Sequence, residues 1–84
     1  MMTDLGHIQQ NVYASLASIT DRDVQQLDDE QPIIALGISS HLMVDLLMSL
    51  EQAFSLAIPE AKLYQCSTIG DVCRLIAELQ HEKG

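Results

Sequence analysis

Hydrophobic residues recur every three or four positions in three separate stretches of the chain, at about 5–19, 40–54 and 69–79. This spacing aligns apolar side chains along one face of a helix, so the pattern predicts three amphipathic helices. The expected buried stripes are Leu5, Ile8, Val12, Leu16 and Ile19, then Met43, Leu46, Leu47, Leu50 and Phe54, and last Ile69, Val72, Cys73, Ile76 and Leu79.

The segments between these stretches carry residues that start or stop helices. Residues 20–31 are polar and include the acidic run 28–30, so they predict a long first loop. Pro32 argues against a continuous helix there. Pro59 suits the first turn of a short helix at about 60–64, and residues 81–84 are expected to fray. The candidate anchors of the loop are Val24, Leu27 and Ile33, and the candidate N-caps are Thr3 or Asp4 for the first helix and Ser67 or Thr68 for the last.

The predicted fold class is therefore all-α. We expect a small helical bundle of three main helices plus a short third helix, with a long first loop. The 84 residues suit a single domain, 1–84, with its core at about 5–79. Because aromatic residues make up only 4% of the chain and apolar residues 48%, the core is aliphatic, which suits packed helices better than a sheet.

The charge of the chain narrows the range of partners. Four Lys and Arg stand against 12 Asp and Glu, a net charge of −8, which disfavours nucleic acid as a partner. A basic protein surface fits better, although the same acidity also keeps a chain soluble. No apolar run reaches the ~18 residues that suggest a membrane span, and the N-terminus lacks the segments of a signal peptide. We expect a cytoplasmic, free-standing protein, with a domain excised from a larger protein as the alternative.

The two cysteines, Cys66 and Cys73, lie seven residues apart, and no nearby Cys or His completes a zinc-site pattern. On one helix they would be about 10.5 Å apart, which is too far for a disulfide. The sequence therefore predicts two buried free thiols and no metal site.

Candidate chemistry concentrates at the start of the second helix. Gly37 breaks the chain, Ser39 suits the N-cap, and Ser40 opens the helix. The Ser40 hydroxyl would be exposed beside the positive end of the helix dipole, where a phosphate ester is favoured. Ser49 and Ser55 lie within or after the helix, lack this turn geometry, and are expected to be surface residues.

Four segments in order resemble the acyl carrier protein family, from about residue 5 to 79. They are Pro32-Ile33-Ile34-Ala35-Leu36-Gly37-Ile38-Ser39-Ser40, the helix Val44 to Phe54, the pair Ile58-Pro59, and Ser67-Thr68-Ile69-Gly70-Asp71-Val72 continuing to Leu79. The resemblance implies that Ser40 carries a covalent 4′-phosphopantetheine arm, with Ser39 as the alternative attachment site.

The chain departs from the family pattern at three positions. Ser39 stands where the family often has Asp, whose charge is thought to assist the metal site of the modifying transferase, so modification is expected to be slower. His41 replaces an apolar residue, and Leu42 replaces an Asp of dedicated fatty-acid carriers, which resembles polyketide or other specialised carriers. An unmodified helical interaction module is therefore kept as the second hypothesis.

The resemblance implies a non-catalytic, monomeric carrier that holds an acyl group as a thioester for fatty-acid, polyketide or related biosynthetic enzymes. Ser40 and His41 are no nucleophile and base, because adjacent helix residues point in different directions. The implied partners are a phosphopantetheinyl transferase and the acyltransferases, ketosynthases or ligases that load and unload the arm. Val44 and Met48 fit either a wide buried face or an apolar docking patch. The expected docking residues are His41, Val44, Asp45, Met48, Glu51 and Gln52.

Overall fold

The computed structural model describes residues 5–83 of the 84-residue chain, and this part consists of helices and connecting turns without a β-strand. The predicted all-α bundle, with its short third helix and long first loop, is confirmed. The N-cap candidates Thr3 and Asp4 lie outside the described residues. The elements are the helices α1 (Leu5–Thr20), α2 (Ser40–Phe54), α3 (Glu60–Tyr64) and α4 (Ile69–Lys83), and the 3-10 helices η1 (Val24–Gln26) and η2 (Ile33–Leu36).

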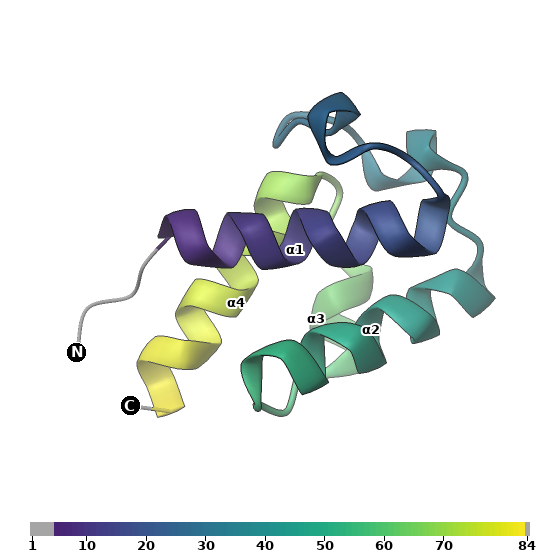
Figure 1. Cartoon of the computed structure of the whole chain (residues 1–84). Coiled ribbons are helices and arrows are strands. Elements are labelled where there is room, and N and C mark those ends of the chain that lie inside the picture. The colour runs from purple at the N-terminus through teal and green to yellow at the C-terminus, as the bar shows by residue number, and fades with distance from the viewer. Residues whose placement is uncertain (1–4, 84) are drawn as a thin grey trace.

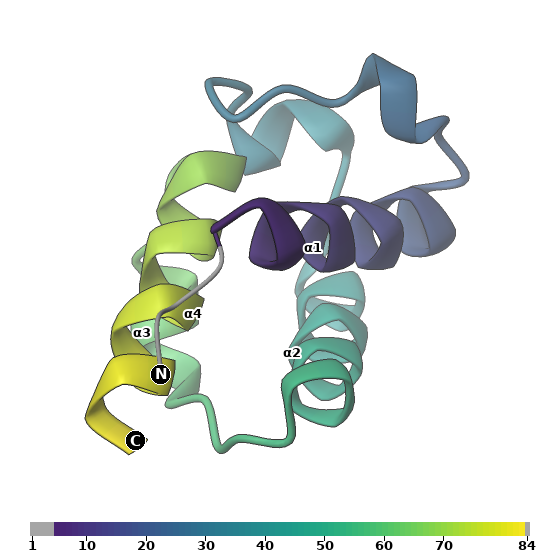
Figure 2. The ribbon, with the colours of Figure 1, turned by 60° about the vertical axis from the view of Figure 1, so that its left-hand side comes forward.

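Helix α1 lies across α2 and α4 and packs against both (Figure 1 and Figure 2). The short α3 contacts α2 and α4, which closes the bundle. The first loop passes over the side of α1 opposite α2, and its η1 turn touches α1 (Figure 1). The loop then descends to the start of α2, so its path sets where that helix begins.

The core is aliphatic, as predicted, and one apolar face of each main helix supplies most of it. The fully buried centre consists of Ile8, Val12, Leu16, Leu46, Leu50, Leu63, Ile69, Val72 and Ile76. Leu75 is buried as well, which widens the α4 stripe beyond the predicted positions. Met43, Leu47 and Leu79 pack at the margin of the core and are only partly buried.

Two predicted apolar positions are wrong. Leu5 begins α1 and is 60% exposed, because the first turn lies at the end of the helix beyond the buried stripe. Val24 is exposed in η1, whereas the other two loop anchors, Leu27 and Ile33, are buried. The η1 turn is held by its own polar groups: Asp23 Oδ1 accepts from the Gln25 N–H, so the turn forms without burial of Val24.

Asp29 attaches the first loop to both α1 and α4. The Tyr13 hydroxyl donates to Asp29 Oδ1 at 2.5 Å, and Gln9 Nε2 donates to the same oxygen at 3.0 Å. The Gly70 N–H donates to the Asp29 carbonyl oxygen at 2.8 Å, and a Cβ on Gly70 would lie 3.1 Å from that oxygen. The close approach of loop and helix therefore explains a glycine in the first turn of α4.

Helix α4 has a reciprocal N-terminal cap on Thr68, one of the two candidates. Thr68 Oγ1 accepts from the Asp71 N–H at 3.2 Å, and Asp71 Oδ2 accepts from the N–H groups of Ser67 and Thr68. These bonds lower the pKa of Asp71. The helix continues to Lys83, so the predicted end at about Leu79 is too early.

Of three smaller predictions, one is confirmed and two are wrong. Ser49 is not a surface residue, because its hydroxyl donates to Ser15 Oγ at 3.0 Å between α2 and α1, where Ser15 is buried. Ser55 is exposed, as predicted, and ends α2 in the left-handed conformation. Pro59 stands one residue before α3 rather than in its first turn.

Candidate functional site

The turn before α2 depends on one backbone conformation. Gly37 ends η2 with φ of 74°, and its N–H donates to the Ile34 carbonyl oxygen at 3.2 Å. L-residues with a side chain adopt this left-handed region at a cost, which glycine avoids. A Cβ at Gly37 would meet no atom within 4 Å, so the glycine is required by the backbone and not by crowding.

The two serines after this turn have different roles in the helix start. Ser39 is the N-cap, as predicted, and its Oγ accepts from the Leu42 N–H at 3.3 Å. Ser40 is the first residue of α2 and is exposed. The cap thus engages the hydroxyl of Ser39, whereas Ser40 is an exposed residue at the end of the helix.

The surroundings of Ser40 suit a phosphate ester and a chain attached to it. The first turn of α2 contains no acidic residue, so nothing there opposes the attraction of the helix dipole for an anion. Ser40 also borders a groove of about 490 Å³ between η2, α2 and the end of α3. The residues present therefore fit 4′-phosphopantetheine.

The groove is mainly apolar, and one of its lining residues, Tyr64, was not among the candidates from the sequence. Its principal lining residues are Ile33, Ile34, Ile38, Met43, Tyr64 and Cys66. A hydrogen bond to the Glu60 carboxylate raises the pKa of Tyr64, which is half exposed at the groove. No local pattern pointed to Tyr64, because it belongs to a five-residue helix without a complete amphipathic repeat.

Both cysteines are free, as predicted, but only Cys73 is fully buried. Cys66 follows α3 in a turn, is partly buried, and its thiol donates to the Lys62 carbonyl oxygen at 3.5 Å. Burial raises the pKa of each thiol to about 11, so both are neutral at pH 7. The prediction of two buried thiols is therefore wrong for Cys66, because a turn at the groove covers it less than a helix interface covers Cys73.

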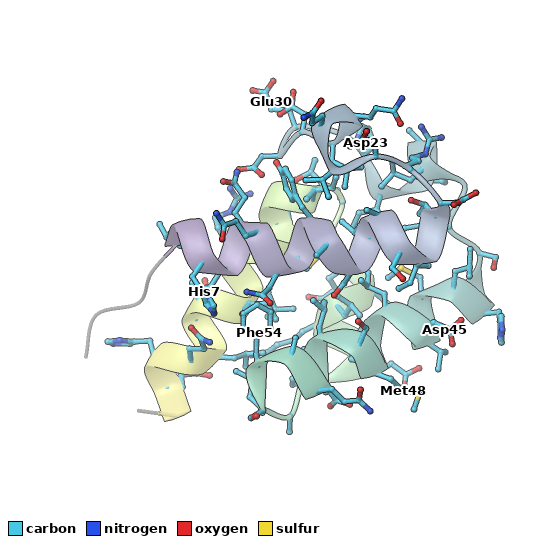
Figure 3. The ribbon with its side chains drawn as sticks, viewed as in Figure 1. His7, Asp23, Glu30, Asp45, Met48 and Phe54 are labelled. Carbon is cyan, nitrogen blue, oxygen red and sulfur yellow. The ribbon has the colours of Figure 1, made fainter. Side chains whose placement is uncertain are left out.

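Five of the six expected docking residues are exposed along the outward face of α2: His41, Val44, Asp45, Met48 and Gln52. Asp45 and Met48 point away from α1 (Figure 3). Val44 and Met48 are 40% and 55% exposed, which decides against a wide buried face. His41 Nε2 lies 3.8 Å from Asp45 Oδ2, so these two side chains are neighbours on this face.

Glu51 differs from the other five docking candidates. It is half buried, and its Oε2 accepts from the Ile58 N–H at 3.0 Å. This bond ties the end of α2 to the loop before α3. Glu51 therefore supports the fold as well as adding negative charge to the helix face.

Comparison with known proteins identifies the class. The family model described as a phosphopantetheine attachment site matches residues 10–76, from within α1 to within α4. The chain belongs to this family, which confirms the resemblance to carrier proteins, and its cofactor is covalent 4′-phosphopantetheine. The chain is a phosphopantetheine carrier domain.

Among curated proteins, the chain is similar to a non-reducing polyketide synthase of Emericella nidulans, dbaI, with 22% identity over 73 residues. The similar region covers 87% of this chain and 3% of the synthase. The chain thus corresponds to a small part of that relative.

Within residues 5–83 there is no group of three or more His, Cys, Asp or Glu side chains arranged to hold a metal ion. No helix in that range combines the length and apolar character needed to cross a membrane.

Proposed function

We propose that Ser40 carries the arm and that the chain holds an acyl group on it as a thioester. The observation that carries this assignment is the exposed Ser40 at the first position of α2, directly after a serine that is used as the cap. Thioester chemistry resides in the thiol of the arm when it is bound. The protein itself supplies position, a groove and a docking surface, and is not a catalyst.

The attachment step uses Ser40 as the nucleophile. Its oxygen attacks the phosphorus that bears the pantetheine half of coenzyme A. A serine–phosphorus bond forms, the pyrophosphate P–O bond breaks, and adenosine bisphosphate leaves with the electron pair. The serine proton passes to a base of the phosphopantetheinyl transferase.

The mass of the intact protein after treatment with coenzyme A and a broad-specificity phosphopantetheinyl transferase tests the assignment. Ser40→Ala is expected to abolish the mass increase. Ser39→Ala is the matched control, and it should only slow modification, because it removes a cap and leaves the nucleophile in place. Loss of modification in Ser39→Ala with retention in Ser40→Ala would reverse the two roles. If the wild-type protein gains no mass, the chain is instead an unmodified interaction module.

We further propose that the enzymes that load and unload the arm are of the polyketide synthase kind and dock on the outward face of α2. The similarity to a polyketide synthase supports the class of enzyme. The exposed pair Val44 and Met48, with Asp45 between them, supports the surface. A small mixed surface of this kind suits brief encounters with ketosynthases, acyltransferases or ligases.

Two substitutions on this face of α2 distinguish electrostatic attraction of a partner from apolar contact with it. Asp45→Lys is expected to slow acyl transfer at low salt, with a smaller effect at high salt. Met48→Ala is expected to raise the dissociation rate, because it removes apolar contact. Glu78→Lys makes the same charge change at an exposed position of α4 and is the matched control. If Asp45→Lys and Met48→Ala both transfer at wild-type rates, the docking surface lies elsewhere.

A further inference from the structure

Ile34 is the most exposed of the large hydrophobic residues in the described part of the chain, at 84%. It lies in η2, where Ile33 and Leu36 are buried at 6% each. The turn is fixed by several backbone bonds, among them Ile33 N–H to the Ser67 oxygen at 2.8 Å and Ala35 N–H to the Pro32 oxygen at 3.1 Å. Because its neighbours are anchored, Ile34 cannot turn inward without breaking the turn.

Ile34 also borders the groove that Ser40 borders. An enzyme that acts at the far end of a long arm does not need to approach Ser40. The transferase does, because its reaction forms a bond to the Ser40 oxygen itself. Of the partners implied by the proposed function, the transferase therefore has to cover the surface around Ser40, which includes Ile34.

The charge around Ser40 indicates what kind of surface covers it. Residues 23–61, which contain η1, η2 and all of α2, hold seven acidic residues and no Lys or Arg, and Arg22 and Lys62 directly flank this range. Asp28 and Glu30 of the loop and Asp45 of α2 are exposed. Glu30 and Asp45 lie on opposite sides of α1 (Figure 3). A partner that covers Ser40 thus meets an apolar side chain on a surface with more acidic than basic residues, which is complementary to an apolar pocket with a basic rim.

We propose that Ile34 is an apolar anchor that inserts into the phosphopantetheinyl transferase when that enzyme modifies Ser40. The proposal rests on the proposed function, since it requires Ser40 to be the modified residue. It adds η2 to the docking surface, whereas the six expected docking residues all lie on α2. It also gives the transferase a contact that is separate from Val44 and Met48.

Steady-state kinetics of modification by coenzyme A and a broad-specificity transferase test the proposal. Ile34→Ala should lower kcat/KM about tenfold or more, mainly through a higher KM, because an isoleucine side chain buried in the complex is lost. Ile34→Leu should keep most of the wild-type value. Val24→Ala is the matched control, because Val24 is also β-branched, exposed and in a 3-10 turn of the same loop, but does not border the groove. Circular dichroism checks that every variant folds.

Each result has a distinct meaning. Wild-type kcat/KM in Ile34→Ala overturns the proposal and leaves the proposed function intact, since the wild-type protein is still modified. An equal loss in Val24→Ala also overturns it, because the effect is then not specific to the groove. Unchanged modification with faster hydrolysis of the loaded thioester in Ile34→Ala would assign the residue to the cargo. Self-association that Ile34→Ala abolishes in sedimentation, again with unchanged modification, would assign it to a second copy. A wild-type protein that gains no mass overturns both proposals.

Discussion

Replacing Tyr13 by phenylalanine removes the phenol oxygen that ties the first loop to α1. The bond from the Tyr13 hydroxyl to Asp29 Oδ1 is short, 2.5 Å, and its acceptor is a carboxylate. The same bond lowers the pKa of Asp29 more than any other interaction does. Burial, and then this bond, raises the pKa of Tyr13 to about 12. The substitution keeps the ring and its packing, so it isolates the hydrogen bond.

The expected loss of stability is modest. A hydrogen bond to a charged group contributes about 1.5–3 kcal/mol. Both side chains are only partly buried, and Gln9 still donates to Asp29 at 3.0 Å, which favours the lower end of that range. A loss of about 1.5 kcal/mol corresponds to a fall in Tm of about 6–12 °C for a domain of this size. The Gly70 N–H, which donates to the Asp29 carbonyl oxygen, should exchange faster with solvent.

The pH dependence follows from the two pKa shifts. The pKa of Asp29 is lower in the folded state than in the unfolded state. Its contribution to the free energy of unfolding is therefore complete above the unfolded pKa of about 3.9 and is lost as the pH falls through the folded pKa. The folded pKa of Tyr13 is raised to about 12. The contribution of Tyr13 to the free energy of unfolding is complete below its unfolded pKa of about 10 and is lost as the pH rises toward 12. The stability difference between wild type and Tyr13→Phe should therefore be constant near neutrality and shrink at both extremes.

Urea unfolding followed by circular dichroism, at several pH values, measures these differences. Tyr64→Phe is the matched control, because Tyr64 is half exposed. This substitution should lower the free energy of unfolding by no more than about 0.5 kcal/mol. A Tyr13→Phe variant as stable as the wild type at neutral pH would refute the conclusion that this bond holds the loop. So would a loss that did not change in acid, since the carboxylate would then not be the acceptor that matters.

Three further predictions concern single residues. Without reductant the unfolded protein should give two free thiols, and in the native state Cys66 should label faster than Cys73, because it is less buried; equal native rates would contradict the burial difference. Gly37→Ala should lower the free energy of unfolding by about 1 kcal/mol, measured in urea, because φ of 74° strains any side chain, with a smaller loss in Gly37→Asn; an unchanged value would show that the turn relaxes. Ser39→Ala should cost about 1 kcal/mol in the same assay, as the loss of an N-cap, and no cost would mean that its bond to the Leu42 N–H contributes nothing.

The main helices and the start of α2 could be predicted from the sequence because their causes are local. Apolar residues at helical spacing mark the buried face, and Leu46, Leu50 and Phe54 are buried as that spacing requires. Gly37 and Ser39 define the turn and the cap through bonds that span only three residues. The place of Ser40 at the first position of α2 follows directly from these short-range interactions.

The packing of the first loop and the groove beside α2 could not be predicted in this way, because both depend on contacts between distant parts of the chain. A 3-10 turn is too short to show a periodic pattern, and the expected loop anchors are accordingly confirmed for Leu27 and Ile33 but wrong for Val24. The structure buries Ile33, whose N–H donates to the Ser67 carbonyl oxygen, and leaves Ile34 exposed. Tyr13 and Asp29 are 16 residues apart and meet only after α1 and the loop have packed. The sequence thus determined which residues form helices and where the candidate serine stands, whereas tertiary packing decided which loop residues face the core and which face a partner.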